Sequence, residues 1–164
     1  MTTTQILKLQ LDFVYTSVEA NTAGMSAEDS LAAPESGGNC ANWILGHLTH
    51  VQNRLHALLG AAPAWIDESL ERDWDEPIDG PDTALDFMAM REAFLDSKAR
   101  CLEAMESQTP EALAEDGFPS PFGGMATREW ILAVLTFHQA YHAGQLAVAR
   151  RVAGYAGVFK QPGS

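Results

Sequence analysis

Apolar side chains recur every three or four residues in four separate stretches of the chain. In residues 4–20 they stand at Ile6, Leu7, Leu9, Phe13, Val14 and Val18. This spacing is typical of an amphipathic helix, because 3.6 residues per turn bring such positions to one side. Similar patterns predict three further helices at 39–59, 83–107 and 127–154.

Residues with known preferences for helix ends support these boundaries. Asn39 is a suitable N-cap for the second helix, and Gly60 followed by Pro63 would stop it. Thr83 and Asp86 form a pair that resembles a capping box at the start of the third helix.

The connections between these helices are long and rich in helix breakers or charge. Residues 61–81 are acidic and are expected to hold only a short helical turn near 65–72; the run DESLERDWDEP within them is interpreted as a solvated loop. No segment alternates convincingly as a strand would, so no sheet is expected. We therefore predict an all-α four-helix bundle with long inter-helix connections, forming one domain over residues 1–164.

Charge and composition narrow the classes of function. The 164 residues carry a formal net charge of -12, which repels phosphate backbones and anionic lipids and argues against nucleic-acid and membrane partners. The N-terminal residues lack a signal-peptide pattern, and the two cysteines, Cys40 and Cys101, form no disulfide framework. A reduced cytoplasmic protein is the expectation.

Two histidines in the last helix are the first candidates for chemistry. His138 and His142 are four residues apart, which places them about 40° apart around the helix and one turn apart along it. They fall on the same side as Ile131, Leu135 and Leu146, so they face the core. Two such imidazoles can share a divalent metal ion, although two hydrogen-bonded core histidines would give the same pattern.

The second helix supplies three more histidines, which helical geometry separates. His56 falls on the polar stripe of the helix and is predicted to face solvent. His47 lies on the core side and is the best third ligand, whereas His50 lies about 60° away at the edge of that side. We expect His50 to line the pocket or to orient a ligand; a hydrogen-bonded core histidine remains the alternative for His47.

The residues WILGHLTHVQ and HQAYHAGQLAVARRVAG resemble the signature of the DinB-like superfamily of metal-binding four-helix bundles. The most specific piece is H-x-x-Y-H-x-G-Q, here His138, Tyr141, His142, Gly144 and Gln145, and the resemblance covers nearly the whole chain. It implies that His47, His138 and His142 bind a divalent transition metal, with zinc the first choice and nickel, iron or manganese as alternatives. It also implies pairing into a homodimer and, from characterised relatives, the use of low-molecular-weight thiols.

Several neighbours of the histidines have two interpretations each. Trp43, one turn before His47, would wall the metal pocket or serve the core, and Tyr141 is a further pocket candidate. Gln145 would orient a ligand or make an interhelical hydrogen bond. Gly144 inside a helix indicates close packing of a neighbouring helix.

Three histidine ligands leave a metal with an open position, as in catalytic rather than structural sites. Such a metal could activate a thiol for attack on an electrophilic small molecule, or water for hydrolysis. Hydrolysis also needs an acid or base, and neither histidine-bearing helix face offers a carboxylate. The candidates elsewhere are Asp12, Glu19, Asp86, Glu92 and Asp96, or a loop residue. This favours a metal-dependent thiol transferase, with a metal-dependent hydrolase or a non-catalytic metal and ligand binding protein as alternatives.

Overall fold

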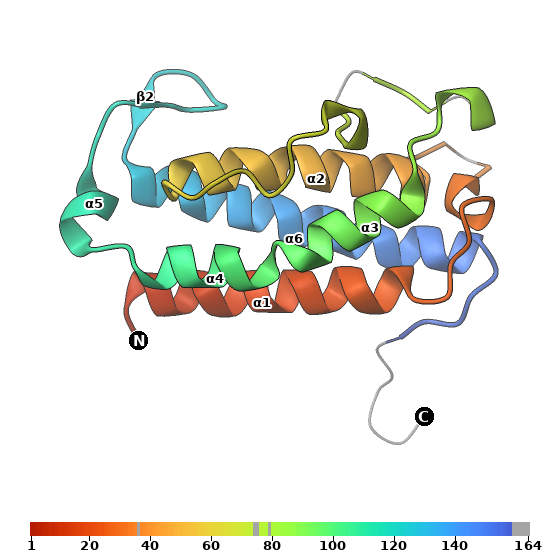
Figure 1. Cartoon of the computed structure of the whole chain (residues 1–164), viewed down its shortest axis with the longest axis horizontal. Helices are drawn as coiled ribbons and strands as arrows, with labels where there is room; N and C mark the ends of the chain where they lie inside the picture. Colours follow the sequence, from red (N-terminus) through yellow and green to blue (C-terminus); the bar gives the residue numbers. More distant parts are fainter. Residues whose placement is uncertain (36, 74–75, 79, 159–164) are drawn as a thin grey trace.

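The computed structural model describes residues 1–35, 37–73, 76–78 and 80–158. Within them, the main helices lie side by side along the long axis of the molecule (Figure 1). Their bounds are α1 Thr3–Thr22, α2 Ala41–Leu58, α3 Phe87–Asp96, α4 Lys98–Glu106, α5 Pro110–Ala114 and α6 Arg128–Val152. Short 3-10 turns cover η1 Asp29–Leu31, η2 Glu68–Leu70 and η3 Pro81–Thr83, and the strands are β1 Phe118–Pro119 and β2 Met125–Ala126.

The bundle has four members, of which α3 and α4 together form the third. Helix α6 packs against α1 and α2, while α1 also packs against α4 and α2 against α3. Their inner faces share one core, which includes Leu11, Tyr15, Leu48, Phe94 and Leu146. The prediction of an all-α four-helix bundle with long connections is confirmed.

The third member is not the single helix expected for residues 83–107. Ser97 interrupts it: the Ser97 hydroxyl donates to the Phe94 carbonyl at 2.7 Å and lies 2.8 Å from the Tyr15 hydroxyl. A hydroxyl that takes a main-chain carbonyl in this way competes with the helical ladder. The start is also later than predicted, because Asp86 is itself the N-cap and accepts from the Met88 and Ala89 amides.

The second helix also begins later than predicted. Its N-cap is Cys40 rather than Asn39, and the Cys40 side chain makes no capping hydrogen bond. Cys40 is buried whereas Asn39 is exposed, so core packing rather than capping accounts for this end of the helix.

A small hairpin precedes α6, contrary to the expectation of no strands. β1 and β2 pair antiparallel, with Phe118 opposite Ala126, and each has two residues, too few to show alternation in the sequence. Gly123 and Gly124 have φ of 92° and 74° in the connecting turn, where a side chain would be strained.

The polar stripe of α2 is covered by the connection between α2 and α3 and does not face solvent. The prediction that His56 is exposed is therefore wrong. His56 is 0% exposed, and its Nδ1 lies 2.9 Å from the Ala62 carbonyl. Asn42 exchanges two hydrogen bonds with the main chain of Leu85, and Asn53 binds the Trp65 carbonyl at 3.1 Å. The connection between α2 and α3 supplies these partners.

The same contacts correct the interpretation of the acidic run as a solvated loop. In its described part, the Arg72 amide donates to the Gly46 carbonyl at 3.0 Å, and the Thr49 hydroxyl donates to the Leu70 carbonyl. A Cβ on Gly46 would lie 2.7 Å from Leu85 Cδ1 and 3.0 Å from Arg72 Cβ, so glycine permits this close approach. The segment is fastened along α2; Trp74 and Asp75 of the run lie outside the described residues.

Candidate metal centre

Helix α2 places His47 on its buried side, and the fastened connection orients the imidazole. His47 Nδ1 lies 3.0 Å from the Arg72 carbonyl oxygen. A carbonyl only accepts, so Nδ1 carries the proton and donates it. The other ring nitrogen, Nε2, therefore keeps a free lone pair, the form in which histidine binds a metal.

Helix α6 orients His142 by a contact within one turn. His142 Nδ1 donates a hydrogen bond to Gln145 Oε1 at 2.8 Å, so Nδ1 keeps the ring proton and Nε2 is left as the ligand atom. His142 Nε2 in turn lies 2.9 Å from His138 Nε2, one turn earlier on the helix. The two Nε2 atoms share one proton in this hydrogen bond. A metal ion bound to both nitrogens could take the place of that proton.

The three histidines form one cluster. Each offers one ring nitrogen, and these three atoms lie within 4.8 Å of one another. Nitrogens bound tetrahedrally to zinc at about 2.0–2.1 Å are about 3.3 Å apart, so small side-chain movements would satisfy the ion. His47, His138 and His142 therefore fit a divalent metal in donor type, number and spacing.

Burial favours the neutral form of all three rings. It lowers the pKa of His47 and of His138, and it lowers the pKa of His142 from an ordinary 6.5 to about 4. The value for His142 results mainly from burial, with the hydrogen bond to Gln145 raising the pKa and the neighbouring His138 and His47 lowering it. At neutral pH the three imidazoles are therefore uncharged, each with one ring nitrogen available to bind a cation.

Two aromatic side chains surround the cluster. The Trp43 ring stacks on His47 with a centroid separation of 4.9 Å, and its Nε1 donates to the Glu76 carbonyl at 2.9 Å. The Tyr141 ring meets His142 edge-on at 5.2 Å and is 57% exposed. Trp43 is thus an inner wall and Tyr141 an outer edge.

His50 stands beside the cluster and not within it. Its ring centroid is 6.3 Å from that of His47, and its Nδ1 lies 3.1 Å from Glu71 Oε2. Glu71 also accepts from Trp65 Nε1 at 3.0 Å and from Asn53 Nδ2. Sequence reasoning missed both Glu71, within a run that looked merely acidic, and the Arg72 carbonyl, which no side-chain pattern could reveal.

A cavity of about 360 Å³ opens beside His47, His50 and His138. Its wall is mostly apolar, from α2, α6 and the hairpin turn, and it carries one acidic and one basic residue, Asp73 and Arg54. The apolar lining residues are Val51, Pro119, Pro121, Phe122, Ile131, Val134, Leu135 and Phe137. The five carboxylates named as acid or base candidates are not among the described lining residues: Asp12 pairs with Lys98 at 2.7 Å, for example, and Asp86 caps α3. The alternative of a loop carboxylate is met by Asp73, which lines the cavity.

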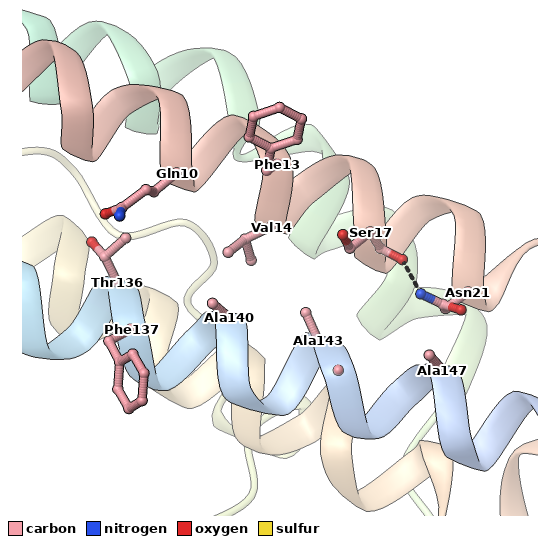
Figure 2. A pocket seen from close by; sticks show the side chains of 11 residues that line it. Gln10, Phe13, Val14, Ser17, Asn21, Thr136, Phe137, Ala140, Ala143 and Ala147 are labelled. Atoms are coloured by element: carbon pink, nitrogen blue, oxygen red, sulfur yellow. Dashed lines mark hydrogen bonds between the residues drawn. The ribbon is translucent and has the colours of Figure 1, made fainter. Parts of the chain in front are cut away.

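The explanation given for Gly144 is wrong. Apart from the backbone of its own helix and its chain neighbours, no atom of the described residues lies within 4 Å of where a Gly144 Cβ would stand, so no neighbouring helix requires glycine there. Gly144 lines a separate groove of about 370 Å³ between α1 and α6. In Figure 2, Ala140, Ala143 and Ala147 of α6 face α1 across this groove.

A family model and a solved structure relate this chain to known proteins. A family model for the DinB superfamily matches residues 10–146, a range that spans all three histidines. The chain belongs to the DinB superfamily. The fold of this DinB protein is also similar to the crystal structure of a conserved protein from Enterococcus faecalis.

The two structures share a TM-score of 0.72 over 93% of this chain and 98% of the other, at 17% sequence identity, which establishes the common fold. No curated protein matches the sequence. No helix among the described residues is long and apolar enough to cross a membrane.

Proposed function

We propose that this DinB protein is a metal-dependent enzyme that activates a low-molecular-weight thiol for transfer to an electrophilic small molecule. His47, His138 and His142 would hold a divalent ion, with zinc preferred because three neutral nitrogen donors suit it. When bound, the metal would lower the pKa of a coordinated thiol and so raise its reactive fraction at neutral pH.

The observation that carries this proposal is the orientation of the histidines beside an open cavity. His47 Nδ1 donates a hydrogen bond to the Arg72 carbonyl and His142 Nδ1 donates one to Gln145 Oε1, and the Nε2 atoms of His138 and His142 lie 2.9 Å apart. A purely structural site would close the remaining position with a fourth protein ligand. Within the described residues the cluster has three members, and an apolar cavity lies beside it.

A hydrolase is the second candidate, and Asp73 favours it. This carboxylate lines the cavity beside His47, and its charge acts to raise the pKa of that histidine, against the larger effect of burial. It would serve as the general base that the helices lack. A non-catalytic binding protein is the third candidate, since the cavity can hold a ligand without converting it.

Pairing into a homodimer is also part of this proposal. The described residues that line the groove between α1 and α6 include no charged residue, on a chain of net charge -12. Phe13 and Phe137, at the groove, are 63% and 73% exposed. An uncharged apolar face is where two copies of an acidic chain would meet with least repulsion.

The test begins with metal content. His138→Ala should lose bound metal, whereas His56→Gln, which keeps a donor for the Ala62 carbonyl, should retain it; circular dichroism would verify both folds. Equal metal content in the two variants would overturn the assignment.

Cobalt substitution then separates the three functions. A sulfur-to-cobalt absorption band on adding a thiol, together with thiol transfer to an electrophile, supports the transferase. Cleavage of esters or amides without added thiol would establish the hydrolase, and the absence of both reactions would leave a binding protein.

A further inference from the structure

Among the described residues that line the cavity beside the histidines, Arg54 is the one arginine or lysine. Arg54 stands on α2, seven residues after His47, and its side chain is exposed at the cavity. It also borders an adjacent depression lined by Trp65 and Glu71, so it lies on the ridge between the two hollows. The other charged side chain among the described lining residues is that of Asp73.

The Arg54 guanidinium makes no hydrogen bond or ion pair with any residue that the structure describes. Several other arginines have structural partners: Arg72 donates to the Thr83 carbonyl, Arg128 pairs with Glu115 and Arg150 donates to the Ala23 carbonyl. A guanidinium that supports no part of the fold keeps its donors available for a ligand. Its planar, forked donors match a carboxylate in particular.

The charge of Arg54 reaches the histidine cluster. Burial is the main cause of the lowered pKa of His47 and His138, and the positive charge of Arg54 contributes to both. A molecule that spans from the cluster to Arg54 would therefore remain inside the same cavity. Its middle would meet the apolar wall formed by Val51, Ile131 and the turn at Phe122.

We propose that Arg54 binds the carboxylate of a small amphipathic anion, and so selects a substrate or thiol that has an apolar body and one acidic group. The inference rests on the proposed function for the turnover of this molecule, but its binding can be measured separately. A chain of net charge -12 repels anions in general, so selection of an anion requires a local cation such as Arg54.

The test compares 4-phenylbutyrate with its uncharged amide, 4-phenylbutanamide, on the full chain by calorimetry or ligand-observed NMR. Both metal-free and zinc-loaded protein are measured, because a carboxylate can also bind zinc directly. The wild type should prefer the acid over the amide about fivefold, the value expected for one solvent-exposed ion pair, and added salt should reduce the preference.

Arg54→Gln should abolish this preference in the metal-free protein and leave the affinity for the amide unchanged. Arg151→Gln is the matched control: it removes the same charge from an exposed site near the far end of α6 and should keep the preference. An unchanged preference in Arg54→Gln, or no preference in the wild type, would overturn the inference.

The design separates this inference from the proposed function. If the preference depends on Arg54 but no thiol transfer is found, the anion site stands and the transferase proposal fails. If thiol transfer occurs with no preference for anionic partners, the transferase stands and the role of Arg54 is refuted.

Discussion

Metal binding at the three histidines should resist acid better than binding by ordinary histidines. A protonated imidazole cannot bind a metal, so each histidine weakens the affinity once the pH falls below its pKa. For a histidine of pKa 6.5, a change from pH 7.5 to 5.0 weakens binding about 30-fold, and three such residues together weaken it about 30,000-fold.

The geometry of the cluster predicts a much smaller loss. Burial lowers the pKa of His142 to about 4, so His142 contributes a factor of only about 1.1 over the same pH range. Burial also lowers the pKa of His47 and His138, so each contributes less than the ordinary factor. The total loss should remain below about 1,000-fold.

Cobalt titration of the metal-free protein provides the measurement. The visible absorption of bound cobalt reports occupancy directly, and dissociation constants are compared at pH 7.5 and pH 5.0 in non-coordinating buffers. A histidine-containing peptide of similar ligand number is the reference. A loss of about 10,000-fold or more would mean that the histidines titrate as in water, and the argument from burial would be wrong.

Three further predictions follow. In the metal-free protein, His142 binds a proton below about pH 6.5 when the chain is unfolded but only below about pH 4 when it is folded. The unfolding free energy should therefore fall by up to about 3 kcal/mol as the pH decreases from about 6.5 to about 4. Denaturant titrations should show a steeper fall of the unfolding free energy with decreasing pH in the wild type than in His142→Gln. Gly144→Ala should keep or raise the melting temperature, since no neighbouring element lies near the added Cβ. Gly46→Ala should lower the unfolding free energy by about 1–3 kcal/mol, because its Cβ would meet Leu85 and Arg72. A destabilised Gly144→Ala together with an unaffected Gly46→Ala would contradict the packing. If the proposed transferase function holds, Cys40→Ser and Cys101→Ser should leave thiol-transfer rates nearly unchanged once folding is verified, because the attacking sulfur would belong to the cosubstrate. Loss of activity in folded Cys40→Ser would point to a protein thiol.

The bundle and the histidine cluster were predictable because both depend on helical periodicity. Four apolar stripes require four packed helices, and His138 with His142 share a face whatever the details of the loops. His47 was separable from His56 because the two project in different directions around α2. The structure brings His47, His138 and His142 together as that reasoning expected.

The errors arose where the main chain, rather than a side chain, supplies the partner. Helical geometry predicted that the polar stripe of α2, which includes His56, faces water. Instead, the connection after α2 covers this stripe with main-chain carbonyl groups, such as that of Ala62. Ser97 interrupts a helix by one local hydrogen bond that leaves the apolar period intact on both sides. Periodicity reports which face of a helix is covered, but not whether another segment also covers the opposite face.

The contact between His47 and the Arg72 carbonyl has a consequence for how this sequence can vary. Any amino acid has the carbonyl at position 72, so the contact to His47 does not itself require arginine there, although the Arg72 side chain also donates to the Thr83 carbonyl. The number of residues between Leu59 and Arg72 is a stricter constraint, because an insertion or deletion there would present a different peptide group to the imidazole. In this protein the length of a connection, more than its composition, decides how the candidate metal centre is oriented.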